Sequence, residues 1–252
     1  MAHFLREASD SLFHVDGLVL RSFRVLIGQP GTATLDYLRG RRKPYFKPVQ
    51  LFLLANLLYV VIQPFTGFAA FTTPLSTHLA GGGTIVWEDL AERWVTDRLR
   101  ERQTPMGTYA QDFDDMAHLQ GKSLLILMVP AFAVGAWTLN RRARRYYVEH
   151  LIFSFHFYAL LLLAMAASTM LTQLFLSAAA SVGYRFSHVV IESTSSGILL
   201  LVLGGYLFSS LRRLFRRSAM LTGLQTVILL GWSLVVLSAY RFVLFLTTFA
   251  AT

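Results

Sequence analysis

Three groups of side chains in this sequence have the types and the spacing to carry chemistry, and the first contains two histidines. Glu149 and His156 are seven residues apart, which places them on nearly the same face of a helix, whereas His150 points elsewhere. Histidine titrates near neutral pH and binds metals, so this set can relay a proton or ligate a metal. The structural alternative, which we favour, places Glu149 and His150 at the membrane interface beside Arg144 or Arg145, with His156 hydrogen-bonded between helices.

The second group is acidic and precedes the second long apolar run. Asp114 and His118 are four residues apart and share a face if this stretch is helical, a spacing that suits a divalent cation. Two more carboxylates, Asp112 and Asp115, lie beside them. Acidic loops are usually only solvated, so the pair is a weak metal candidate. We therefore predict no cofactor.

The third group consists of single polar residues inside apolar runs. Arg241 interrupts the last run, and its side chain either extends to the outer headgroups, which we favour, or pairs with Glu192. Asn56 and Gln63 are seven residues apart in the first run and face the same way. Polar groups within a membrane are costly and often functional, so all three intramembrane residues are candidate sites.

The elements that must position these side chains are long apolar runs. The chain has 252 residues, of which 54% are hydrophobic and 15% charged, whereas soluble domains carry about 25% charged residues. Crossing a bilayer takes roughly 20 residues of helix, and these runs do not alternate as barrel strands do. We predict an all-α bundle of five transmembrane helices, at residues 48–70, 123–139, 150–176, 195–211 and 219–249.

Two polar segments complete the predicted organisation. Residues 1–47 form a basic segment whose part 8–27 is amphipathic at helical spacing. This helix lies either in the membrane interface or against the protein's own cytoplasmic side. Residues 71–122 form a loop on the opposite side, with an amphipathic helix over 85–103.

Positive charge is concentrated beside the apolar runs and sets the orientation. The chain has 23 Lys and Arg against 14 Asp and Glu, a net charge of +9. Most of these cations fall on the side of the N-terminus, which is therefore cytoplasmic, and five spans place the C-terminus outside. Anionic lipid headgroups are the expected partner, and nucleic acid is not. The headgroup-binding candidates are Arg39, Arg41, Arg42, Lys43, Lys47, Arg141, Arg142, Arg144, Arg145, Arg212, Arg213, Arg216 and Arg217.

Two stretches of the sequence together form a recognisable pattern. One is TLDYLRGRR at 34–42, continuing through Tyr45 and Pro48 into the first apolar run. The other comprises Lys122, Pro130, Tyr147 and the segment EHLIFSFHF at 149–157. The two stretches resemble a family of uncharacterised bacterial inner-membrane proteins, and this resemblance implies a bacterial inner membrane and no established activity. Longer members carry an N-terminal cysteine-rich zinc ribbon, which this chain lacks because it has no cysteine.

The motif content favours a non-enzymatic role. The sequence contains no glycine-rich phosphate loop, serine nucleophile elbow or HExxH zinc motif. We therefore predict an integral membrane protein that binds or transports a small molecule or lipid, or supports a membrane complex, either as a homo-oligomer or with other proteins. The alternative is a membrane-embedded enzyme that acts on lipid or envelope substrates through the His/Glu or the Asp/His group.

Overall fold

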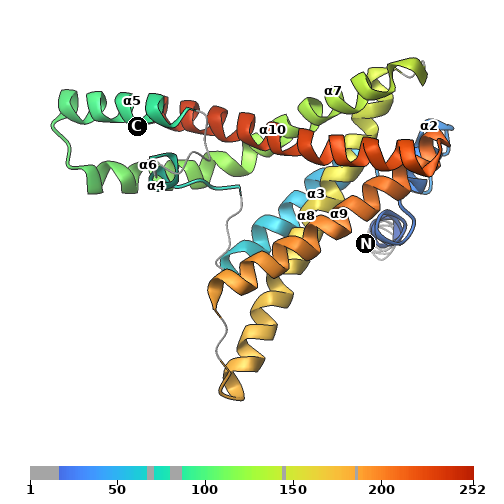
Figure 1. The fold of residues 1–252 in the computed structure, drawn as a ribbon, viewed down its shortest axis with the longest axis horizontal. Helices are drawn as coiled ribbons and strands as arrows, with labels where there is room; N and C mark the ends of the chain where they lie inside the picture. Colours follow the sequence, from blue (N-terminus) through green and yellow to red (C-terminus); the bar gives the residue numbers. More distant parts are fainter. Residues whose placement is uncertain (1–16, 67–70, 80–86, 144–145, 185–186) are drawn as a thin grey trace, which may run out of the picture. The chain divides into compact units, whose positions relative to one another are not determined.

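The computed structural model describes residues 17–66, 71–79, 87–143, 146–184 and 187–252, and within these ranges the chain is helical and contains no strand (Figure 1). The predicted all-α class is confirmed. Among the described residues, five helical segments are long and apolar enough to cross a membrane: Pro48–Thr66, Met106–Ala143, Tyr147–Ser181, Ser193–Phe215 and Ala219–Ala251. Arg144, Arg145 and the predicted helix's residues 8–16 lie outside the described residues, as does the side chain of Glu192.

The chain divides into two compact units. The first comprises Met1–Gly67 and Ala133–Leu230, and the second comprises Phe68–Phe132 and Gly231–Thr252. Two helices, α7 (Met128–Asn140) and α10 (Ala219–Ala251), contribute residues to both units.

The first unit is built on two paired helices, α3 (Pro48–Thr66) and α8 (Tyr147–Ser181), which lie side by side (Figure 1). Proline is well suited to the first position of α3, because the amide hydrogen that it lacks would have no partner within the helix. The contact is aromatic, with the rings of Phe52 and Phe155 edge to face at 5.8 Å. At the other end of α3, Gln173 Nε2 donates a hydrogen bond of 2.9 Å to the Thr66 carbonyl.

Many large apolar side chains of the described helices are exposed. Large side chains such as Leu171, Leu174, Leu201 and Leu234 are each at least 65% exposed. A soluble protein rarely leaves so much apolar surface uncovered, whereas lipid tails solvate it. This exposure and the five apolar segments identify a membrane protein.

A close backbone contact fixes the N-terminal part of the first unit. Residues 17–28 are helical, and Gly31 then caps α2 (Thr32–Leu38) with a left-handed backbone at φ 78°. Gly31 also packs against α9 (His188–Phe215), where a Cβ atom would lie 2.9 Å from the Ser210 Cα. Glycine thus provides both the backbone angle and the space that hold α2 against α9.

The second unit has its own aromatic core. It contains α4 (Leu75–His78), α5 (Glu88–Arg102), α6 (Met106–Leu124), the 3₁₀ turn η1 (Leu125–Leu127) and the end of α10. Helix α5 falls within the range 85–103 predicted to be an amphipathic helix, and α6 begins well before the apolar run at 123–139. The buried cluster comprises Leu75, Ala91, Val95, Tyr109, Phe113, Ala117 and Phe245. Tyr240 anchors α10 in this unit, since its hydroxyl lies 2.8 Å from the Gly121 carbonyl and 3.0 Å from the Phe71 carbonyl.

Candidate functional site

The first unit contains a pocket of about 390 Å³ that we term the basic pocket. It is lined by Leu35, Leu38, Arg39, Glu149, Arg213, Leu214, Phe215 and Arg216. Four of these residues are charged, and four are apolar. The three arginines are among the predicted headgroup-binding residues, and Glu149 belongs to the predicted His/Glu group.

Helix ends place each charged side chain at the basic pocket. Arg39 is the C-cap of α2, and Glu149 lies in the first turn of α8, where a carboxylate is favoured by the helix dipole. Arg213 lies in the last turn of α9, and its Nη1 donates a hydrogen bond to Thr32 Oγ1 at the start of α2. Arg216 ends α9 in a left-handed conformation. The local sequence therefore ends α2 and α9 in arginine, and the contact at Gly31 brings those ends together.

The two histidines support this region without lining the basic pocket. His150 is buried and stacks on Phe215, with ring centroids 5.9 Å apart and planes inclined by 13°. His156 is also buried, and its Nδ1 lies 3.0 Å from the hydroxyl of Thr34 in α2. The structure thus separates the predicted set, because only Glu149 reaches the pocket. A chemical role for the histidines stays a prediction.

The other predicted intramembrane residues of the first unit lie elsewhere. Asn56 and Gln63 are partly buried on α3 and do not line the basic pocket. The sequence pattern did not single out a buried polar pair in the same unit, in which Gln225 Nε2 donates to Asn140 Oδ1 at 3.2 Å. The signal for this pair is weak, since Asn140 directly precedes a cluster of arginines and Gln225 is a lone amide in the last apolar run.

The remaining predicted cations have mostly local contacts. Arg41 is exposed and lies 3.9 Å from the Asp36 carboxylate. Exposed ion pairs of this kind contribute little to stability. Tyr45 also donates to Asp36, at 2.9 Å, and burial together with that bond raises the pKa of the tyrosine. Cation–π contacts place Arg42 over Tyr37, Arg141 over Trp137 and Arg217 over Phe215. Lys43, Lys47, Arg142 and Arg212 are exposed.

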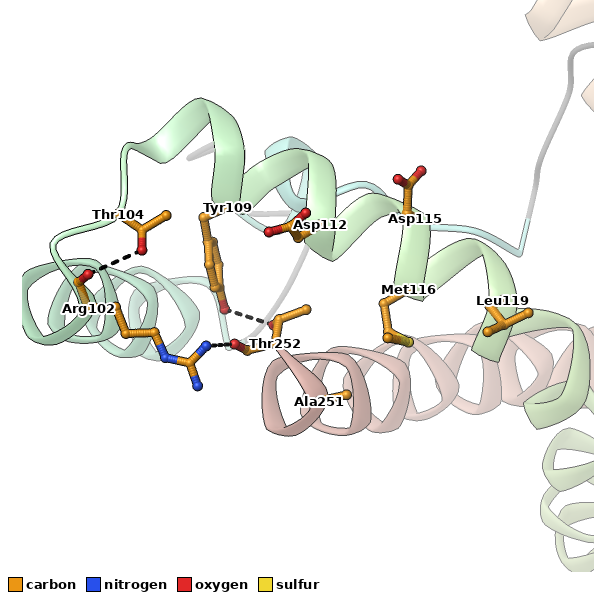
Figure 2. Close-up of a pocket in the computed structure, with 9 residues that line it drawn as sticks. All are labelled: Arg102, Thr104, Tyr109, Asp112, Asp115, Met116, Leu119, Ala251 and Thr252. Carbon is orange, nitrogen blue, oxygen red and sulfur yellow. Dashed lines mark hydrogen bonds between the residues drawn. The ribbon is translucent and has the colours of Figure 1, made fainter.

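A second pocket, of about 500 Å³, belongs to the second unit (Figure 2). It is lined by Arg102, Thr104, Tyr109, Asp112, Asp115, Met116, Leu119, Ala251 and Thr252. Figure 2 shows the guanidinium of Arg102 directed at Thr252, whose carbonyl accepts its hydrogen bond. The hydroxyl of Thr252 also lies 3.2 Å from the Tyr109 hydroxyl. The pocket's cation is therefore already bonded within the protein.

The weak metal candidates are not part of this second pocket. Asp114 Oδ1 accepts a hydrogen bond of 2.7 Å from the Leu75 amide at the start of α4, and His118 is exposed on α6. In the described part of the chain, no group of three or more His, Cys, Asp or Glu side chains could hold a metal ion. The metal site stays a prediction.

The fold and the basic pocket define the class: a polytopic α-helical membrane protein with arginines gathered where its helices end. Residues 16–60 match the model of a family described as "Protein of unknown function (DUF3667)", in line with the expected resemblance to an uncharacterised family. No curated protein and no solved structure matches the chain significantly. The matched segment includes α2 and so supplies Leu35, Leu38 and Arg39 of the basic pocket.

Proposed function

We propose that this membrane protein binds the phosphate group of an anionic phospholipid in the basic pocket. The observation that supports this function is the meeting of Arg39, Arg213 and Arg216, from two helices far apart in sequence, around one pocket. One guanidinium group can donate two parallel, charge-assisted hydrogen bonds to two oxygens of the same phosphate. With Glu149 included, the pocket keeps an excess of positive charge. The ligand that complements it is therefore an anion.

The apolar half of the basic pocket favours a lipid over free phosphate. Leu35, Leu38, Leu214 and Phe215 line it beside the arginines. A glycerol backbone and the first methylenes of the acyl chains can cover these side chains, whereas a free phosphate ion leaves them exposed to water. An anionic leaflet also attracts nearby arginines, by about 1 kcal/mol per cation at the surface.

The orientation belongs to this proposal. We place the N-terminus and the basic pocket on the cytoplasmic side of a bacterial inner membrane, and the C-terminus outside. Because the natural chain has no cysteine, single cysteines report the topology directly. An impermeant maleimide should label Glu101→Cys in intact cells and Ser218→Cys only after permeabilisation. The opposite pattern would reverse the orientation without affecting the pocket.

A matched pair of double variants tests the lipid site. Arg213→Gln with Arg216→Gln removes two cations that line the basic pocket, whereas Arg142→Gln with Arg212→Gln removes two exposed cations that do not. Binding of fluorescent short-chain phosphatidylglycerol to the detergent-purified protein is measured for each. We expect at least about a tenfold loss of affinity for the pocket variant and less than about a threefold loss for the control.

Competition identifies the source of the phosphate. Inorganic phosphate and phosphatidylcholine should displace the probe poorly, because the first lacks the apolar part and the second lacks the net charge. If both double variants lost the same affinity for phosphatidylglycerol, binding would depend on general surface charge and not on the basic pocket, and the proposal would be overturned. If inorganic phosphate displaced the probe efficiently, the ligand of the basic pocket would be a soluble phosphate compound and not a lipid.

A further inference from the structure

Several buried polar atoms of the second unit have no hydrogen-bond partner. They are Thr73 Oγ1, both ring nitrogens of His78, Trp87 Nε1 and Arg241 Nε, none of which is bonded to any described residue. We term these four side chains the buried donor cluster. The side chain of His78 is fully buried, and that of Thr73 is 3% exposed.

The members of the buried donor cluster surround one stretch of α10. The His78 ring lies 5.2 Å from the Phe245 ring and within electrostatic range of Arg241. The Trp87 ring lies 5.0 Å from the ring of Phe242, the residue after Arg241. Thr73 belongs to the segment that the Tyr240 hydroxyl holds at the Phe71 carbonyl. Two chain segments, 71–79 and the one that begins at Trp87, therefore contact residues 240–245 of α10.

The cluster offers donors and one positive charge, but few acceptors. The guanidinium and the indole can only donate, and the hydroxyl of Thr73 is free to donate. Burial and the charge of Arg241 lower the pKa of His78 to about 4, so at pH 7 its neutral ring supplies one N–H group. No carboxylate of the described residues forms an ion pair with Arg241. On α6, the Asp114 carboxylate accepts a hydrogen bond from the Leu75 amide.

Unpartnered donors in a protein interior require an occupant. Each such atom costs about 1–3 kcal/mol, and Arg241, a partly buried residue whose Nε is buried, brings a positive charge as well. A water molecule accepts only two hydrogen bonds and carries no charge to balance the guanidinium. An anion can accept more hydrogen bonds than a water molecule does, and its charge neutralises that of Arg241. Its surroundings include the rings of Phe113 and Phe245, whose edges are electropositive.

We infer that the second unit binds an anion between Arg241, His78, Trp87 and Thr73, as a small inorganic ion or as the phosphate of a lipid headgroup. This site is separate from the basic pocket in residues and in unit, and it does not depend on the proposed lipid-binding function. Its occupant joins the segment 71–79 and Trp87 to α10, so anion binding stabilises the folded unit.

The test is anion-dependent stability of the full chain. Protein is purified in a nonionic detergent, and chloride replaces gluconate at constant ionic strength. A parallel titration adds short-chain phosphatidylglycerol in gluconate to the Arg213→Gln, Arg216→Gln variant, with and without Arg241→Gln, so that lipid bound in the basic pocket does not contribute. We expect a saturable rise of about 4 °C in the thermal unfolding midpoint in at least one titration. Arg241→Gln should abolish this rise, and Arg93→Gln, which changes an exposed arginine on α5, should leave it unchanged.

Trp87→Phe keeps the inference testable if Arg241→Gln does not fold. It keeps an aromatic side chain beside Phe242 but removes the N–H group together with part of the indole ring, so the anion concentration for half-maximal stabilisation should rise about five- to tenfold. A response to chloride identifies an inorganic ion, and a response only to phosphatidylglycerol identifies a lipid phosphate. The inference is overturned if neither anion stabilises the protein or if Trp87→Phe responds as the wild type does.

Discussion

The basic pocket and the buried donor cluster present positive charge to a ligand in opposite ways. The basic pocket has three arginines, all exposed, at the ends of α2 and α9. The buried donor cluster has one partly buried arginine, surrounded by neutral donors in an aromatic core. The first keeps its cations hydrated until a ligand arrives, whereas the second has already lost much of its hydration on folding.

This difference predicts different selectivity. Exposed arginines attract any anionic surface, and salt screens that attraction over about 8 Å at physiological ionic strength. Salt screens the attraction between buried donors and an anion much less, and such donors bind only a ligand that fits among them. The basic pocket is thus suited to a fluid, abundant ligand such as a phospholipid, and the buried donor cluster to one retained ion or phosphate.

The largest expected effect concerns the backbone contact that forms the basic pocket. Gly31→Ala places a Cβ atom 2.9 Å from the Ser210 Cα and strains a residue at φ 78°. We expect it to lower the free energy of unfolding in detergent by about 3 kcal/mol and to weaken phosphatidylglycerol binding in parallel. Gly40→Ala is the control, because Gly40 has φ 84° but a Cβ atom added there would meet nothing within 4 Å.

Only backbone strain applies at Gly40, so its alanine variant should lose about 1 kcal/mol. Equal losses at the two glycines would show that α2 does not depend on close packing against α9. The assembly of the basic pocket would then need another explanation.

The second effect belongs to the buried donor cluster and depends on pH. The folded protein holds the pKa of His78 near 4, against 6.5 for an ordinary histidine. As pH falls, the unfolded chain binds this proton first, so the stabilisation is complete above about pH 6.5 and is lost progressively towards pH 4. The loss should be on the order of 2 kcal/mol, measured by unfolding in gluconate, without a binding anion, from pH 7 to 4.

Two variants isolate the histidine. His78→Leu should flatten this part of the pH profile, whereas His118→Gln, at an exposed position on α6, should keep it. A wild-type slope that survives in His78→Leu would assign the pH dependence to other groups.

The third effect tests a buried hydroxyl that does have a partner. Thr34→Val removes the hydroxyl that lies 3.0 Å from Nδ1 of the buried His156 and so removes a buried contact between α2 and α8. We expect a loss of about 1.5 kcal/mol in unfolding free energy. Thr226→Val is the control, since that hydroxyl bonds the Thr222 carbonyl within its own helix. Losses of similar size in both variants would remove the special role of the Thr34–His156 contact.

Composition predicted the fold class because a bilayer allows few alternatives. Long apolar runs must be helical in lipid, and the five runs correspond to five apolar helical segments in the structure. The start of α6 was not predicted, since Asp112, Asp114 and Asp115 interrupt its apolar pattern. Its buried side was nevertheless visible in the sequence, because Tyr109, Phe113 and Ala117 recur every four residues.

The candidate sites were only partly predictable. Clustered arginines predicted lipid contacts, but which of them meet depends on the packing of Gly31 against Ser210, a contact between residues far apart in the chain. Arg241 stands out in the sequence because a charge within an apolar run is unusual. Its neighbours His78 and Trp87 carry no comparable signal, because a lone histidine and a lone tryptophan become informative only when burial leaves their nitrogens without partners.

The smallest expected effect comes from Thr73→Val in the buried donor cluster. It makes the same substitution as Thr34→Val, so the two variants compare a hydroxyl without a partner and a hydroxyl with one. Thr73 is also buried, but its hydroxyl has no partner among the described residues. In gluconate, Thr73→Val should change the unfolding free energy by less than about 0.5 kcal/mol or raise it slightly, since an unsatisfied hydroxyl is removed. With the stabilising anion present, the same variant should have a lower free energy of unfolding than the wild type, because the anion loses one hydrogen-bond donor. A loss in gluconate as large as that of Thr34→Val would mean that Thr73 is satisfied within the protein, and the buried donor cluster would then have no need of an anion at that position.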